Sequence, residues 1–440
     1  MDSTAFLARR RALLAKLQPN SVVVVPAAQL KTRSRDTEYH FRQDSDFWYL
    51  TGFHEPNAWL LLSNSDQYDG EYSLLACLDK DQQAEIWHGR RVGPDAALSA
   101  YLMDDTCTVE QLPWALHDLL DGHAHLYFAI GQSASADELV FAALDKLRSA
   151  PKQSKQAPQT LLDVRPILHE MRLIKQPDEL ELMQKAATIS AAAHCRAMRE
   201  VTQLEYEYQL EAALLHEFAS RGARHAAYNT IVGSGENACI LHYTENSDAL
   251  NDGELVLIDA GAEYAGYAAD ITRTFPISGS FSEPQAQIYQ LVLDAQAAAL
   301  EQLRPGSTLS KATRACLEVL VNGLIKLDIL QGECAALIAK KAYQPFFMHG
   351  LGHYLGLDVH DVGDYKINGN DRPLLPGMVL TVEPGLYFGP TTNVPEQYQG
   401  IGVRIEDNIV ITDTGFINLT ADVPKTISDI EALIQRGREL

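Results

Sequence analysis

The stretch LIDAGAEYAGYAADITRTF, Leu257 to Phe275, decides the fold of the second part of the chain. It predicts two apolar strands joined by a turn over residues 263–266. Each strand carries one aspartate where an apolar residue is expected, Asp259 in the first and Asp270 in the second. Burying a carboxylate in an apolar sheet is costly, so the two aspartates need an explanation.

Pairing the two strands about a centre between Tyr264 and Ala265 places Asp259 directly opposite Asp270. Opposed residues in an antiparallel pair have Cβ atoms about 4.5–5.5 Å apart, so two bare carboxylates there would repel each other and lose hydration. Arg273 lies three residues beyond Asp270 and is therefore expected on the other face. This stretch alone fits a bound metal ion and a solvated hairpin end equally well.

The second stretch, MHGLGHYLGLDVHD, holds three histidines within twelve residues: His349, His353 and His360. The spacing of the first two is that of the helical HExxH zinc motif, but glycines interrupt the helix and no glutamate follows His349. We therefore expect a glycine-rich loop in which the backbone allows imidazoles to converge, and this favours a site over three separate structural histidines. The glycines are Gly350, Gly352, Gly356 and Gly363.

Two further strands carry charges. In GMVLTVEPGLYF, Glu383 ends an apolar strand before Pro-Gly, a placement that fits an active site or a satisfied strand end. In GIGVRIEDNIVIT, Arg404 and Glu406 alternate with apolar residues and share one face. They either pair with each other, or Glu406 binds a metal ion while Arg404 screens the excess negative charge.

Together these positions form a candidate metal set of four carboxylates and one imidazole, without thiolate. Such a hard, oxygen-rich set suits Mn²⁺, Co²⁺, Fe²⁺ or catalytic Zn²⁺ and does not suit a structural zinc. Two divalent ions balance four negative charges better than one, and such a pair lowers the pKa of a shared water. This is equipment for hydrolysing an amide. The set is Asp259, Asp270, His353, Glu383 and Glu406.

The organisation of the chain predicts two domains. Up to residue 172, short apolar runs such as SVVVVPA and AWLLLS alternate with helical patterns, which predicts an α/β domain. The Pro- and Gln-rich segment 148–160 and a helix starting near Pro177 indicate a boundary between 150 and 175. From 173 to 440, helices over about 178–200, 203–220, 283–303 and 309–325 alternate with strand pairs, which predicts an α+β domain.

The composition excludes some partners. The 440 residues are 46% apolar and carry a formal net charge of −22, so nucleic-acid and membrane-surface binding are not expected. No apolar run of about 18 residues predicts a membrane-spanning helix, and the N-terminus is a poor signal peptide. Six scattered cysteines without a CxxC pair fit a reduced, cytoplasmic protein, and none is expected to carry chemistry.

The four stretches closely resemble the metal motifs of the pita-bread metallopeptidases, the family of methionine aminopeptidase, prolidase and aminopeptidase P. FRQDSDFWYLTGF (Phe41 to Phe53) and LLDVRPILHEMRLIKQPDE (Leu161 to Glu179) are similar to the N-terminal domain and junction of bacterial Xaa-Pro aminopeptidases. The resemblance covers nearly the whole chain. It implies a C-terminal pita-bread domain, with helices on a curved, mostly antiparallel sheet, and an N-terminal α/β domain that contributes to oligomerisation and the substrate cleft.

The resemblance also implies residue roles. Asp259 would bind one ion, Asp270 and Glu406 would bridge both ions, and His353 and Glu383 would bind the second ion. The catalytic residues would be Glu383, which handles the proton of the bridging water, together with His360, His349, His242 and Arg404. Substrate would contact His242, His349, His360, Tyr387 and Arg404.

The activity so implied is removal of the first residue from peptides with proline second, by attack of a metal-bridging hydroxide on the Xaa-Pro bond. The expected cofactors are two divalent ions, with Mn²⁺ as the family expectation, and the expected assembly is a homo-oligomer, a tetramer or a dimer. Prolidase is the enzyme alternative, and a non-catalytic peptide-binding module is the alternative from another class. Asp36 and Trp87 are candidates to reach an active site across subunits, and the basic linker residues Lys152 and Lys155 stay without a role.

Overall fold

The computed structural model describes residues 2–439, which separate into two compact units. The first unit extends to Arg172 and the second begins at Leu173. Within residues 2–439, no helix is both long enough and apolar enough to cross a bilayer.

The first unit is built on a six-stranded mixed sheet with the strand order β6-β5-β4-β1-β7-β8. Strand β4 pairs antiparallel with β1 and β5, whereas β7 pairs parallel with β1 and β8, and β6 pairs parallel with β5. A small hairpin, β2 with β3, stands apart from this sheet. The strands are β1 (Ser21–Pro26), β2 (Thr32–Ser34), β3 (Thr37–Glu38), β4 (Trp59–Ser63), β5 (Tyr72–Cys77), β6 (Asp105–Thr108), β7 (His125–Phe128) and β8 (Thr160–Leu162).

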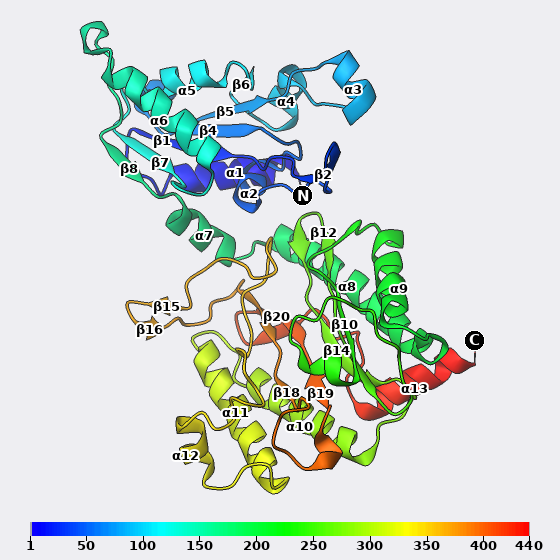
Figure 1. The fold of residues 1–440 in the computed structure, drawn as a ribbon. Helices are drawn as coiled ribbons and strands as arrows, with labels where there is room; N and C mark the ends of the chain where they lie inside the picture. The colour runs from blue at the N-terminus through cyan, green and yellow to red at the C-terminus, as the bar shows by residue number, and fades with distance from the viewer. Residues whose placement is uncertain (1, 440) are drawn as a thin grey trace. The chain divides into compact units, whose positions relative to one another are not determined.

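Helices cover this sheet as the alternating apolar pattern requires. Val22 and Val24 of β1 pack with leucines of α5 and α6, and Figure 1 shows these two helices side by side along the sheet. Helices α1 and α2 contact β4, and α2 also contacts β1. The helices are α1 (Ser3–Leu14), α2 (Ser45–Thr51), α3 (Gln82–His88), α4 (Pro94–Ala100), α5 (Leu112–Leu120), α6 (Ala134–Arg148) and α7 (Arg165–Leu173), which runs across the boundary.

Segment 148–160, expected as part of the boundary, lies inside the first unit. It connects α6 to β8, the edge strand of the sheet, and Lys155 within it lies 2.7 Å from Asp121. Its Pro-rich composition therefore marks a surface connection rather than a linker, because a polar loop within a domain has the same composition as one between domains.

The second unit pairs its strands antiparallel throughout the described residues. Two three-stranded sheets, β10-β11-β14 and β17-β20-β21, provide its frame, and contacts between β14 and β19 join its two halves. The strands are β9 (His225–Ala226), β10 (Ile231–Ser234), β11 (Leu255–Asp259), β12 (Ala262–Tyr264), β13 (Tyr267–Ala268), β14 (Thr272–Pro276), β15 (Lys366–Ile367), β16 (Asn370–Asp371), β17 (Val379–Val382), β18 (Gly385–Tyr387), β19 (Gly402–Arg404), β20 (Asp407–Ile411) and β21 (Phe416–Asn418).

Long helices pack against one face of these strands, and Figure 1 shows them around the strands of the second unit. Val256 and Ile258 of β11 lie in the core with the helices, whereas Leu257 and Asp259 have the opposite parity and face a separate small cluster or a cavity. The helices are α8 (Pro177–Glu200), α9 (Glu207–Ser220), α10 (Glu283–Leu300), α11 (Leu309–Lys326), α12 (Cys334–Ala339) and α13 (Ile427–Arg438). The predicted α/β plus pita-bread α+β architecture is confirmed.

The register predicted for the opening stretch is wrong by two residues. Ala265 and Gly266 both have positive φ, +50° and +85°, and form a two-residue turn of the kind that joins tight hairpins. Tyr264 therefore pairs with Tyr267, and Asp259 lies opposite Thr272 rather than Asp270. The expected turn had been centred too early because Ala265 does not usually adopt a left-handed conformation.

Candidate active site

A cavity of about 540 Å³ in the second unit gathers nearly all the predicted site residues. All five members of the candidate metal set line it, and so do His242, His349, His360 and Arg404. Apolar and polar neighbours that the sequence did not indicate complete the wall: Tyr228, Asn229, Ile231, Leu241, Thr244 and Val359.

Asp259 and Asp270 approach each other although they are not directly paired. Asp259 ends β11, and Asp270 precedes β14 on the neighbouring strand. The hydroxyl oxygen of Tyr228 lies 2.6 Å from Oδ1 of each aspartate. A single hydroxyl has one proton to share between two carboxylates, so this arrangement suits a pair whose negative charge is balanced by a cation.

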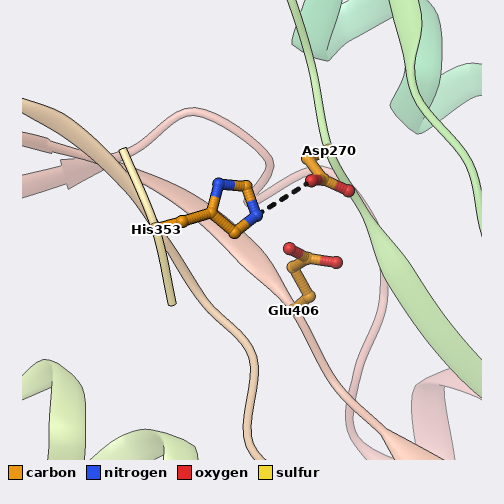
Figure 2. A group of neighbouring side chains, drawn as sticks. All are labelled: Asp270, His353 and Glu406. Atoms are coloured by element: carbon orange, nitrogen blue, oxygen red, sulfur yellow. Dashed lines mark ion pairs between the residues drawn. The ribbon is translucent and has the colours of Figure 1, made fainter. Parts of the chain in front are cut away.

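Asp270, His353 and Glu406 present ligand atoms that all lie within 4.8 Å of one another (Figure 2). Nε2 of His353 is 3.4 Å from Oδ2 of Asp270 and 3.5 Å from Oε1 of Glu383. The other ring nitrogen, Nδ1, lies 3.0 Å from the carbonyl oxygen of Tyr354. Donation from Nδ1 to that carbonyl leaves Nε2 as the free ligand, which is how metal-binding histidines are oriented.

The loop that carries His353 packs closely against strand β17. The backbone N–H of His353 donates to Oγ1 of Thr381, whose hydroxyl lies 3.1 Å from Oε1 of Glu383. Any side chain at Gly352 would collide with the carbonyl oxygen of Thr381. Glycine is therefore required for this approach, and the prediction of a loop rather than a helix is confirmed by the irregular backbone from residue 348 to 361.

The electrostatics of the buried carboxylates favour a cation. Burial raises the pKa of Glu406 well above its usual range, and the charges of Asp270, Glu383 and Asp259 add to that effect. Burial likewise raises the pKa of Asp259, against the lowering effect of Arg404, and raises that of Glu383 to about 7. In Asp270 the contact with His353 outweighs the effect of burial and lowers the pKa. Three buried carboxylates with raised pKa values therefore fit divalent ions, which would favour their ionised states.

Arg404 pairs with Asp259, not with Glu406. Its Nη2 lies 2.6 Å from Oδ2 of Asp259, and its Nη1 donates to the hydroxyl of Tyr387 at 3.0 Å. Glu406 instead accepts from Oγ1 of Thr272 at 2.7 Å. Of the two sequence interpretations, a direct Arg404–Glu406 pair is thus wrong, and Arg404 offsets negative charge at the aspartate side of the site.

Tyr387, expected to line the cleft, lies behind it. Its side chain is buried, and its hydroxyl lies 2.7 Å from Nε2 of His349 as well as near Arg404. Burial lowers the pKa of His349 to about 4, so this imidazole is neutral and can accept from the tyrosine. Tyr387 therefore reaches the cavity only through Arg404 and His349, because the strand β18 turns its side chain inward.

Support for the ligands comes from residues that sequence reasoning missed. Asn408 accepts from the backbone N–H of Asp270 at 3.0 Å and donates to the carbonyl of the same residue. On the opposite face of the strand, as its parity predicts, Arg273 forms a buried ion pair with Asp407 at 2.7 Å. Tyr228, Thr272 and Thr381 were also missed, because a single hydroxyl in an apolar run leaves no pattern.

Other predicted positions lie in the first unit. Trp87 is 82% exposed and Asp36 is exposed, so both are accessible on that unit. Lys152 lies in an exposed turn, and Lys155 is engaged by Asp121. The six cysteines are all free thiols, and burial raises the pKa of Cys239, the one nearest the cavity wall in sequence, to about 12.

Comparison with known proteins identifies relatives along the whole chain. Residues 181–413 match the model of metallopeptidase family M24, and residues 6–127 match the N-terminal domain of aminopeptidase P. The Xaa-Pro aminopeptidase of Escherichia coli (strain K12) is 51% identical over 436 residues, which cover 99% of this chain and 98% of that protein.

Solved structures of a relative have the same fold as this chain. Escherichia coli aminopeptidase P, as a variant in complex with substrate and as a zinc-substituted form in complex with product, superposes with a TM-score of 0.98 in both cases. Each is 50% identical, and the match covers 100% of both chains.

Proposed function

The chain belongs to metallopeptidase family M24 and is an Xaa-Pro aminopeptidase, and from that premise we propose how its residues perform the reaction. The observation that carries the proposal is the convergence of four buried or half-buried carboxylates and one imidazole on a single cavity. We propose that Asp259 would hold one divalent ion, that His353 and Glu383 would hold a second, and that Asp270 and Glu406 would help to hold both.

When bound, divalent ions supply Lewis-acid charge that polarises a carbonyl and lowers the pKa of water. Glu383 is the proton carrier of the proposal, because its carboxylate lines the cavity and lies 3.5 Å from Nε2 of His353, beside the other metal ligands. His360 would assist proton transfer. Its exposure at the cavity and the 4.3 Å between its ring centroid and that of His353 support this role.

The substrate side of the proposal uses two imidazoles and one guanidinium. His242 and His349 line the cavity and form the surface against which the proline ring packs. Arg404 holds Asp259 in place and orients His349 through Tyr387. A proline amide lacks an N–H, so a shaped pocket replaces the backbone hydrogen bonds on which other peptidases depend.

Prolidase, which shares these ligands, is not favoured, since the relatives reported above are aminopeptidases. The decisive assay uses metal-stripped protein with and without Mn²⁺ on a tripeptide with proline second and on the matching Xaa-Pro dipeptide. We expect release of the first residue from the tripeptide, dependent on Mn²⁺. Cleavage of the dipeptide alone would assign a prolidase, and no cleavage with any divalent ion would overturn the proposed chemistry.

The proposal also covers the native ion, the location and the assembly. Mn²⁺ is proposed as the native ion because the donor set is rich in oxygen and lacks thiolate. A cytoplasmic location agrees with six free cysteines. We also propose a homo-oligomer, a tetramer or a dimer, in which the first unit contributes the interface and part of the cleft; the exposed Ile86 and Trp87 support this.

A further inference from the structure

Glu207, the first residue of α9, is fully buried and accepts five hydrogen bonds. Its Oε1 accepts from the backbone N–H of Ser234 at 2.7 Å, from the hydroxyl of Ser234 at 2.8 Å and from the side-chain amide of Asn237 at 3.1 Å. Its Oε2 accepts from the hydroxyl of Tyr243 and from the backbone N–H of Asp248, both at 2.9 Å.

Each of these five donors is neutral, so the carboxylate is held by hydrogen bonds and not by an ion pair. Burying a carboxylate in this way costs several kcal/mol unless its lone pairs are used fully, and here both oxygens are used. Glu207 has no role in core packing or in the metal site. Its burial therefore indicates that the segment it binds has to be held in place.

That segment, residues 234–248, carries part of the cavity wall. Leu241, His242 and Thr244 line the cavity, and His242 is directly followed by Tyr243, which Glu207 holds. Asn246 attaches the same segment to β10: it accepts from the N–H of Val232 at 2.9 Å and donates to the carbonyl of Thr230 at 2.9 Å.

Tyr243 links this clamp to the ligand network. Its ring is buried in a small cluster with Ile231, Leu257 and Tyr387, the last of which contacts both Arg404 and His349. The ring of Tyr243 thus packs against Tyr387, and its hydroxyl donates to Glu207. The neighbouring His242 lines the cavity.

We propose that Glu207 is a positioning residue for substrate, which clamps segment 234–248 so that His242 stands at a fixed place in the wall of the cavity. The proposal rests on the proposed contact of His242 with substrate. Glu207 itself touches neither the cavity nor a metal ligand; it acts through Tyr243, Asp248 and Ser234.

The test uses metal-loaded full-length enzyme and a tripeptide with proline second. Glu207→Gln keeps the side-chain volume, but its amide N–H group would face N–H and O–H donors where a carboxylate oxygen now accepts from them. Glu205→Gln, two residues earlier and exposed, is the matched control. Tyr243→Phe removes a single donor and covers the case in which Glu207→Gln does not fold. Amide hydrogen exchange of segment 234–248 reports the clamp directly.

We expect faster exchange in segment 234–248 and a KM raised roughly tenfold in Glu207→Gln, a smaller shift in the same direction in Tyr243→Phe, and neither effect in Glu205→Gln. Combined with His242→Ala, Glu207→Gln should add little further loss in kcat/KM, since both changes remove the same contact. A lower apparent kcat with unchanged KM, unchanged exchange, or fully additive losses would overturn the clamp. Wild-type kcat/KM in His242→Ala would instead overturn the proposed substrate contact and the clamp's purpose with it.

Discussion

Nζ of Lys175 lies 2.8 Å from Oδ2 of Asp361, and both side chains are 1% exposed. Lys175 lies in the short connection between α7 and α8, and Asp361 directly follows His360 of the cavity wall. This buried ion pair therefore ties the start of the second unit to the histidine loop. Any side chain at Gly356 would collide with the pair, which indicates how closely the loop is packed around it.

Lys175→Met is expected to lower the free energy of unfolding by roughly 3–5 kcal/mol, because it removes the cation that lies 2.8 Å from a buried carboxylate. Urea denaturation measures the loss, with Lys185→Met on the exposed face of α8 as the control. A loss below about 1 kcal/mol in Lys175→Met would contradict this account.

Thr272→Val is expected to weaken metal binding about 10- to 100-fold, as losses of hydrogen bonds to ligands do. The valine keeps the shape but removes the donor to Oε2 of Glu406 and the acceptor for Nε of Arg404. Titration calorimetry with Mn²⁺ measures the change. Thr274→Val, two residues along the same strand, removes contacts to the backbone of Arg404 only and should retain wild-type affinity.

His194 should make the apoprotein sensitive to mild acid. Burial lowers the pKa of His194 to about 4, and its Nε2 lies 2.9 Å from the carbonyl oxygen of Ala260. The folded pKa lies below the unfolded value of about 6.5, so stability is complete above pH 6.5 and is lost as pH falls toward 4. Between pH 6.5 and pH 5 the loss should be about 2 kcal/mol.

The measurement compares chemical denaturation of metal-stripped wild type and His194→Gln at these two pH values. Glutamine can still donate to the carbonyl of Ala260 but does not titrate. The wild type should lose more stability than the variant. Equal losses would show that His194 does not contribute to the acid sensitivity.

Metal removal should lower the melting temperature, because ions that bind only the folded state stabilise it by mass action. At a free Mn²⁺ concentration of 100 times Kd, the gain is about 2.7 kcal/mol. Calorimetric melts across a Mn²⁺ titration test this, and Asp270→Asn, which removes a central ligand, should flatten the response. A melting temperature independent of Mn²⁺ would be incompatible with a site built from these residues.

Sequence patterns predicted the residues of the cavity better than their arrangement. Asp259, Asp270, Glu383 and Glu406 could be found because a carboxylate in an apolar strand breaks a simple alternation. Strand parity also placed Arg273 on the opposite face. The wrong hairpin register came from Ala265, whose left-handed backbone is unusual for a residue with a Cβ atom.

Long-range partners were out of reach for the same kind of reasoning. Tyr387 was expected in the cleft but is buried behind Arg404, and only the pairing of β18 with β19 determines this. Lys175 and Asp361 lie 186 residues apart, so no local pattern connects them. Glu207 looks like an ordinary acidic residue at a helix start until its five donors, drawn from residues 234 to 248, are seen together.

The distribution of the metal ligands along the chain has a consequence for assembly. Asp259 and Asp270 belong to one half of the second unit, whereas His353, Glu383 and Glu406 come from the other, with two long helices, α10 and α11, between them in the sequence. An ion that contacts both sets acts as a removable cross-link across a loop of more than eighty residues. A nascent or truncated chain that stops before His353 would contain Asp259 and Asp270 but lack the other three ligands, so it could not hydrolyse a peptide. Activity therefore appears only once the second unit is complete.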